Sequence, residues 1–433
     1  MLTNPVVVSI IVMGVLCLAR LNVLLAILIS ALVAGVLGGI GVEKSINLLI
    51  SGMAGNLETA LSYILLGALA SAIARTNLTL ILIHYIANFV QNRRLMFCLS
   101  IAFFACFSQN LIPVHIAFIP ILIPPLLPLM NHLKIDRRAV ACALTFGLKA
   151  PYVSFSVGFG LIFHTILRDQ LNQNGINVSL GDVSSVMWIG GLSMLVGLLL
   201  AVFVFYRKPR EYQNTYLDEK SIEILEKPSM QRKDFAVLLG AVVAFVVQLW
   251  AGSLPLGALC GIVLMVLLGG IQWGEIDEVM EEGFKMMAFI AFVMLVAAGF
   301  GAVLKETGAI QSLVHYVAAL AGGKFGGALM MLLVGLLVTM GIGTSFGTIP
   351  IIAAIYCPLG LELGFSPAAI ILLVGIAGAL GDAGSPASDS TLGPTAGLNA
   401  DKQHHHIWDT CVPTFLMYNI PLIIGGSIGA ILL

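Results

Sequence analysis

The chain has 433 residues and a formal net charge of −1, with 59% hydrophobic and only 10% charged residues. Soluble globular proteins carry roughly 25% charged residues, so this composition excludes an ordinary soluble protein and indicates a membrane protein. A chain without excess positive charge is not expected to bind nucleic acid. The seven cysteines are scattered without a CxxC pair, so neither a metal site nor a disulfide framework is expected, and no cofactor is predicted.

Apolar runs close to the length that crosses a bilayer, about 20 residues, recur along the whole chain. They include residues 6–18 and 21–38 near the N-terminus, and residues 235–250 and 256–268 in the second half. No basic segment precedes the first run, so we expect a retained helix and not a cleaved signal. These runs predict an all-α polytopic membrane protein with about 10–12 membrane segments.

Two segments of the first half resist a continuous helix, because prolines remove backbone donors and clash with the preceding turn. Residues 107–128 contain five prolines, and residues 146–160 contain Pro151 between glycines. Freed backbone groups cannot face lipid, so these segments are expected to line a cavity. Their polar side chains are candidate substrate-binding or charge-compensating groups: Asn110, His115, Lys149, Ser154 and Ser156.

Two of these residues have competing interpretations. Lys149 neutralises a buried carboxylate or binds a substrate carboxylate in one interpretation, and is an interfacial lysine with its charge in water in the other. His115 is a cargo contact or proton carrier in one interpretation, and a structural hydrogen-bonding group in the other.

One long polar stretch, residues 207–234, holds seven of the 21 Lys and Arg residues. Basic loops of membrane proteins lie in the cytoplasm, so this stretch is predicted to be cytoplasmic. It divides the chain into a first transmembrane repeat at residues 1–206, a charged linker at 207–233 and a second transmembrane repeat at 234–433.

The two halves resemble each other at an offset of about 231 residues: residues 36–53 match 267–284, and residues 84–90 match 315–321. Duplication is typical of secondary transporters. The first half carries ten Lys and Arg residues, whereas the matching loops of the second half are nearly free of them. Loops on the same side should share this charge, so we predict two inverted repeats, each with a re-entrant hairpin-like segment and a broken transmembrane helix.

The second half repeats both irregular segments, at residues 339–358 and 378–391. The first contains Thr344 and Ser345, which are further candidate substrate-binding groups. The second, GALGDAGSPASDST, contains Asp382 and Asp389 among hydroxyl residues. An ionisable residue inside a membrane is a functional hypothesis by default, and a buried carboxylate can hold H⁺ or Na⁺. The alternative is an interfacial loop with helix-capping Asp and Ser residues.

The sequence GDAGSPASDSTLGP, with its continuation GLNADKQHHHIWDTCVPTF, resembles the signature of the NhaC-type sodium/proton antiporter family. It is also similar to a branch of that family with amino-acid-transporter-like members. The resemblance implies an inverted-repeat fold in a bacterial inner membrane. It also implies an ion-binding site for Na⁺ and H⁺ formed by Asp382, Ser385, Ser388, Asp389 and Thr391.

Other classes fit the sequence less well. An intramembrane aspartyl protease needs two carboxylates from separate helices, and the first repeat offers no acid partner for residues 379–382. Paired breaks in a duplicated unit favour alternating access over a fixed channel. The three adjacent histidines, residues 404–406, do not share a helix face and are interpreted as a polar loop without metal.

The predicted function is secondary active exchange of Na⁺ for H⁺ across the membrane. The alternative is Na⁺- or H⁺-coupled transport of a small amino acid or carboxylate. The expected partners are therefore membrane lipid, the two ions and such a solute. A second copy of the chain, in a homodimer, is a further possible partner.

Overall fold

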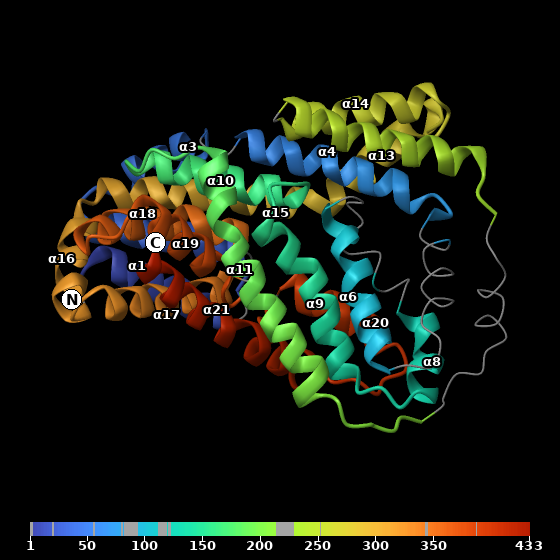
Figure 1. The fold of residues 1–433 in the computed structure, drawn as a ribbon. Helices are drawn as coiled ribbons and strands as arrows, with labels where there is room; N and C mark the ends of the chain where they lie inside the picture. The colour runs from blue at the N-terminus through green and yellow to red at the C-terminus, as the bar shows by residue number, and fades with distance from the viewer. Residues whose placement is uncertain are drawn as a thin grey trace.

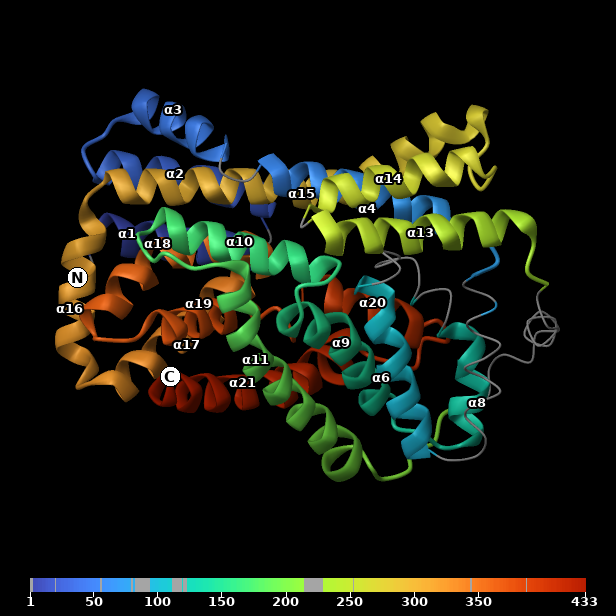
Figure 2. The ribbon, with the colours of Figure 1, turned by 45° about the horizontal axis from the view of Figure 1, so that its top comes forward.

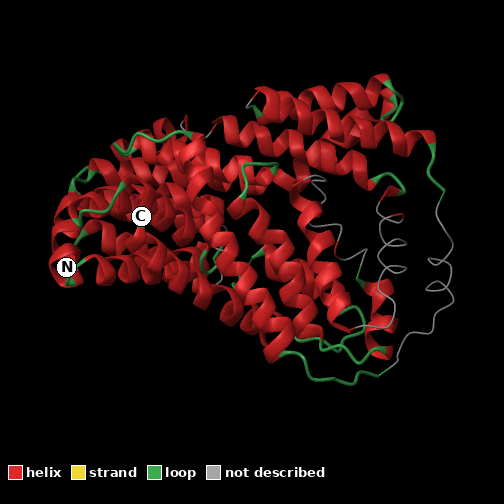
Figure 3. Cartoon of the chain, viewed as in Figure 1, coloured by secondary structure: helices red, strands yellow, loops and turns green. Residues whose placement is uncertain are grey.

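The computed structural model describes residues 3–433 except 20, 55–56, 79–80, 82–93, 111–118, 120–122, 214–228, 252, 343–344 and 387. Within these residues the regular structure is entirely helical (Figure 3). The helices of the first half are α1 (Pro5–Leu18), α2 (Val23–Leu37), α3 (Val42–Met53), α4 (Leu57–Ala74), α6 (Arg94–Asn110), α8 (Leu127–His132), α9 (Arg137–Ser154), α10 (Phe159–Gln173) and α11 (Leu180–Leu200).

The second half contains a similar series after the linker. Its helices are α13 (Arg232–Ala251), α14 (Leu254–Leu267), α15 (Ile276–Glu306), α16 (Ala309–Ala321), α17 (Lys324–Ile342), α18 (Ser345–Glu362), α19 (Pro367–Ala379), α20 (Asp389–Leu398), the π-helical η5 (His406–Cys411) and α21 (Val412–Leu432).

The element order shows the duplication directly. α2 and α14 begin 231 residues apart, at Val23 and Leu254, and α10 and α20 begin 230 residues apart, at Phe159 and Asp389. The matched helices α11 and α21 run antiparallel. Residues 189, 193 and 197 of α11 lie beside residues 429, 425 and 417 of α21. Antiparallel matched helices are what an inverted repeat produces.

The helices form two layers (Figures 1 and 2). In the first layer, α15 packs along α2, α3 and α4, while α13 and α14 pack on each other and α14 reaches α4. In the second layer, α9, α11, α19 and α21 pack together, with α6 and α20 against α9. α15 also contacts α18 and so joins the layers. Each layer therefore combines helices from both halves of the sequence.

Four described helices are long and apolar enough to cross a membrane, and α9 with α10 makes a fifth as a pair bent by 47°. Seven shorter apolar helices accompany them. The prediction of an all-α polytopic protein with broken helices is thereby confirmed. The bend lies between Ser154 and Phe159, where Gly158 adopts a φ of 57° that favours glycine.

The two hairpin-like segments have different outcomes. Most of the first, residues 107–128, lies outside the described residues. The second has a junction at residues 343–344, also outside them, after which α18 continues as one helix of 18 residues through Pro350 and Pro358. That length allows α18 to span the bilayer. Buried packing against α15 and α19 stabilises a helix that its prolines alone would disfavour.

Candidate ion-binding site

The loop that joins α19 to α20 forms the centre of the site. It begins at Leu380, where α19 ends in extended backbone. Gly381 and Gly384 have φ values of 77° and 102°, which glycine adopts at little cost. A Cβ at Gly381 would lie 2.5 Å from the Leu336 carbonyl oxygen, so only glycine fits there.

The side chain of Asn419 on α21 replaces hydrogen bonds that the break removes from the helix. Its Oδ1 accepts from the Gly381 amide at 2.9 Å, and its Nδ2 donates to the Ala383 carbonyl at 2.8 Å. A broken backbone in a membrane needs such internal partners. Asn419 thereby holds the loop that carries Asp382.

Asp382 is the most highly coordinated acid of the site and is only 5% exposed. Its Oδ2 accepts from the Ser345 amide at 3.2 Å and from the Ser345 hydroxyl at 2.6 Å. The Tyr152 hydroxyl lies 3.4 Å from the same oxygen, and the Ser388 hydroxyl donates to Oδ1. These donors come from α9, the start of α18 and the loop itself, so both halves contribute.

Lys149 on α9 forms an ion pair with Asp382. Its side chain is 3% exposed, and its Nζ also donates to the Tyr152 hydroxyl at 3.0 Å. Tyr152 in turn shares a hydrogen bond of 2.9 Å with the Ser345 hydroxyl. Burying either charge alone is costly, so each of the two ions makes burial of the other possible.

Asp389 occupies a different environment from Asp382. It is the first residue of α20 and is half-buried. Its negative charge there interacts favourably with the positive end of the helix dipole. Within the described residues its side chain makes no hydrogen bond or ion pair, but its charge interacts with Lys149 and Tyr63. Lys149 therefore lies in the field of two carboxylates while contacting one.

The neighbouring hydroxyl groups divide into two sets. Ser388 contacts Asp382 and lies 2.9 Å from the Ser390 hydroxyl. In contrast, Thr391 donates to the Ser385 and Ser388 carbonyls, and Ser385 donates to the Met340 carbonyl at 3.2 Å. Ser385 and Thr391 thus brace the loop, and their hydroxyl protons point to backbone oxygens.

Two further candidate residues of the first half, Ser154 and Ser156, have hydrogen-bond partners other than Asp382. Ser154 donates to the Ala150 carbonyl within α9. Ser156 contacts His164 and Ser184 in a separate polar cluster at the bend. The side chain of Asn110, and the whole of His115 and Thr344, lie outside the described residues.

Tyr152 and Asn419 are site residues that the sequence did not reveal. Tyr152 follows Lys149 by three residues and therefore lies on the same helix face, which is a usable signal. Asn419 lies in an apolar helix, and nothing in the sequence connects it with a loop 36 residues earlier.

The three adjacent histidines make separate contacts. His404 contacts the Thr410 hydroxyl, and His406 contacts Thr395 and the Pro386 carbonyl. No group of three or more His, Cys, Asp or Glu side chains that could hold a metal ion occurs in the part of the chain that the structure describes.

Comparison with known proteins places these features in a family. Residues 143–427 match the Na⁺/H⁺ antiporter family, and residues 4–90 match a second Na⁺-H⁺ antiporter family description. An uncharacterized membrane protein of Vibrio parahaemolyticus is 49% identical over 99% of this chain and 100% of its own length. YuiF of Bacillus subtilis, named as a candidate amino acid transporter, is 47% identical over 99% of this chain and its entire length.

More distant proteins share part of the sequence or the fold of this chain. The Na⁺/H⁺ antiporter NhaC of Alkalihalophilus pseudofirmus is 28% identical over 36% of this chain and 34% of its own. The YdaH transporter of Alcanivorax borkumensis shares the fold with a TM-score of 0.60 at 13% identity, over 90% of this chain and 87% of that chain. MtrF of Neisseria gonorrhoeae has a TM-score of 0.64 at 15% identity, over 91% and 85%. The chain is a multi-pass membrane protein that belongs to the Na⁺/H⁺ antiporter family of transporters.

Proposed function

We propose that the protein is a secondary active transporter that exchanges Na⁺ for H⁺ by alternating access, with Asp382 as the coupling carboxylate. The observation that carries this proposal is the buried Lys149–Asp382 ion pair beside the breaks of both repeats. A carboxylate with one buried counter-ion exchanges that counter-ion for another cation without leaving net charge in the membrane.

The contacts of Asp382 support a competition between Na⁺ and the Lys149 ammonium. The Ser345 and Ser388 hydroxyls now donate to Asp382, and a hydroxyl can rotate to present a lone pair to a cation instead. Hard oxygen ligands of this kind suit Na⁺. Once Na⁺ neutralises Asp382, the Lys149 ammonium loses its buried partner, and burial favours the neutral amine.

Charge balance then couples the ions. Na⁺ arrives at Asp382 and one proton leaves the Lys149 ammonium or a protonated Asp389, so the charge of the site is unchanged. In the reverse step Lys149 regains a proton and returns to Asp382 as Na⁺ departs. Asp389 lies in the field of Lys149 and provides a second position for that proton. The two states differ in which cation holds the two repeats together, and this biases their arrangement.

A second candidate function is Na⁺- or H⁺-coupled transport of an amino acid. The observation that favours it is the 47% identity to YuiF over 99% of the chain. In this case the Lys149 ammonium would bind the substrate carboxylate after Asp382 takes the coupling cation. The same ion pair would therefore serve both functions.

Purified protein in proteoliposomes separates the two candidates. An imposed Na⁺ gradient should change internal pH in the absence of amino acids, and Asp382→Asn should abolish this change. Asp277→Asn, an exposed acid on α15, is the matched control and should transport normally. Na⁺-driven uptake of labelled amino acids without a pH change in their absence would favour the second candidate. Asp382→Asn with normal transport of both kinds would contradict both.

A further inference from the structure

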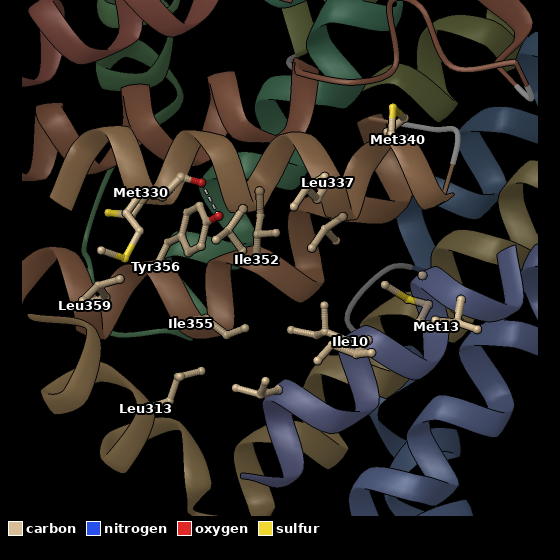
Figure 4. A pocket seen from close by; sticks show the side chains of 17 residues that line it. Ile10, Met13, Leu313, Met330, Leu337, Met340, Ile352, Ile355, Tyr356 and Leu359 are labelled. Carbon is tan, nitrogen blue, oxygen red and sulfur yellow. Dashed lines mark hydrogen bonds between the residues drawn. The ribbon is translucent and has the colours of Figure 1, made fainter. Parts of the chain in front are cut away.

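An apolar crevice of about 420 Å³ lies between α1, α17 and α18, with one contribution from α16 (Figure 4). Its walls include Ile10 and Met13 from α1, Met330 and Met340 from α17, and Leu313 from α16. The one hydroxyl in the wall, that of Tyr356, donates to the Met331 carbonyl and so has a partner already.

The chemistry of these walls selects an apolar occupant. A buried water needs two to four polar partners, and cavities without them stay dry. The volume lies in the range of small-molecule sites, about 300–1,000 Å³, so the space is large enough for an extended hydrocarbon chain. Methionine side chains, which contribute four of the 17 lining residues, adapt their shape to such a chain.

The crevice opens onto the surface that faces the bilayer. Three of its lining residues are strongly exposed, with Ile11 at 51%, Val15 at 58% and Leu337 at 64%. In a multi-pass membrane protein the medium next to such apolar side chains is the hydrocarbon of the bilayer. Lipid acyl chains are therefore the molecules with direct access.

The length of the crevice and a nearby positive charge indicate which class of lipid it can bind. Met330 and Met340 are ten residues apart on α17, about 15 Å along the helix, which is half of the about 30 Å hydrocarbon core. Six residues, or about 9 Å, before Met330 lies Lys324. It is exposed, it stacks on Phe365, and it has no ion pair among the described residues. Lys324 and Met340 are thus about 24 Å apart along α17, close to the roughly 20–22 Å that one leaflet spans with its headgroup region.

We propose that this crevice binds one acyl chain of an anionic glycerophospholipid, with Lys324 beside its phosphate. The crevice is separate from the proposed ion-binding site at Asp382, but one of its residues contacts the loop that carries Asp382. Met340 ends the crevice, and its carbonyl accepts the hydrogen bond from Ser385 in the Asp382 loop. A bound acyl chain thus packs against the residue that braces this loop.

Lipid retention tests the proposal without measuring transport. Gly14 lines the crevice, and a Cβ there meets no atom within 4 Å, so Gly14→Phe fills the space without moving backbone. Ile428→Phe, at an exposed position of α21, is the matched control. Protein purified from membranes and incubated with phosphatidylglycerol or phosphatidylcholine is analysed by native mass spectrometry.

Wild-type protein and Ile428→Phe should retain one phosphatidylglycerol per chain, and Gly14→Phe should lose it. Lys324→Gln should lower the preference for phosphatidylglycerol over phosphatidylcholine about fivefold, since one basic residue near an anionic headgroup contributes about that factor. Lys324→Arg should restore it. Val334→Phe, from α17, replaces Gly14→Phe if that variant does not fold. Equal lipid retention by filled and unfilled crevices would overturn the proposal, as would a change of oligomeric state alone, which would identify a protein interface.

Discussion

At the residue scale, the properties of the site follow from one buried cation and one buried anion. Lys149 and Asp382 are each nearly inaccessible, and they come from different halves of the chain. A buried pair contributes little net stability, but removing one partner leaves an uncompensated charge that costs about 3–5 kcal/mol. This asymmetry gives a test of the pair that does not depend on cargo.

We predict that Lys149→Ala lowers the free energy of unfolding by about 3–5 kcal/mol and that the double variant Lys149→Ala/Asp382→Asn recovers most of this loss. The free energy of unfolding is measured in detergent by thermal and denaturant unfolding. Lys134→Ala, which breaks the exposed pair with Glu211, should have no measurable effect. Additive losses in the double variant would show that the two charges do not compensate each other.

Residue types identified part of this site, and packing supplied the rest. The two acids and Lys149 are visible in the sequence because charge is rare in apolar segments. The sequence cannot distinguish the acids, whereas the structure pairs Asp382 with Lys149 and leaves Asp389 half-buried at a helix start. Asn419 becomes visible only when α21 packs on the loop. Asn419 could not be predicted as a site residue, because its function depends on a contact between two separate segments. A single sequence does not show which segments pack together.

At the element scale, the bend between α9 and α10 is held by His164. Its Nε2 lies 2.9 Å from the Val153 carbonyl, an acceptor only, so Nε2 carries the proton. Its Nδ1 lies 2.6 Å from the Ser156 hydroxyl. The imidazole thus satisfies a carbonyl near the end of α9 and holds Ser156, two residues beyond the helix. Tyr152 and Lys149 lie in the last turns before this end.

We predict that His164→Ala destabilises the protein by about 1–3 kcal/mol, the cost of an unsatisfied buried polar group. Hydrogen exchange should rise at residues 153–158 and hardly elsewhere. His164→Gln, which can keep a donor to the Val153 carbonyl, should show a smaller effect. His132→Ala, at an exposed position at the end of α8, is the control. Unchanged exchange at the bend in His164→Ala would exclude this role.

A second element, the start of the linker, ties the ends of the two broken segments together. Arg137 at the start of α9 is fully buried and forms two hydrogen bonds with Asp401, which follows α20. The Tyr212 ring stacks 4.2 Å from the Arg137 guanidinium, and Arg210 pairs with Asp409. The sequence predicted residues 207–233 as a cytoplasmic charged linker, and nothing in the charge pattern indicated that its first residues pack against both repeats.

His404 lies among these charges and makes the region sensitive to acid. Burial lowers the pKa of His404 to about 4, while Asp409 opposes the shift and Arg137 and Arg210 add to it. The unfolded chain, with a pKa of about 6.5, then binds more protons than the folded chain between these values, so stability falls as pH drops through this window. The loss reaches about 3 kcal/mol.

We predict that thermal stability in detergent decreases between pH 6.5 and pH 4 and that His404→Gln flattens this decrease. His405→Gln, at the exposed neighbouring position, should retain the wild-type slope. Unfolding temperatures across the pH series provide the measurement. Parallel slopes for all three proteins would assign the acid sensitivity to other groups.

At the scale of the whole molecule, duplication decides most of the architecture. Long apolar runs predicted the helices, and the offset of about 231 residues predicted the repeat, because both patterns extend over many residues. The two-layer arrangement was not predictable. α15 packs on three helices of the first half, and such pairings are set by surface fit between helices that one sequence does not reveal.

The inverted arrangement also fixes which ends of the broken segments meet. Arg137, at the beginning of α9, donates to the Leu398 carbonyl at the end of α20. The first broken segment therefore begins on the side of the membrane where the second one ends. Lys134 and the start of the linker share that side, because Lys134 pairs with Glu211. Since basic loops of membrane proteins lie in the cytoplasm, we predict that this side is the cytoplasmic one.

We predict that, in a cysteine-free variant, Lys134→Cys reacts with membrane-impermeant maleimide only from the cytoplasm, whereas Lys324→Cys reacts only from the opposite side. Both positions are exposed, so reactivity reports the side of the membrane and not burial. Arg94→Cys, which the repeat matches with Lys324, should behave like Lys134→Cys. The labelling is compared in right-side-out and inside-out vesicles. Reaction of Arg94→Cys and Lys324→Cys from the same side would require parallel repeats, in conflict with the antiparallel packing of α11 on α21.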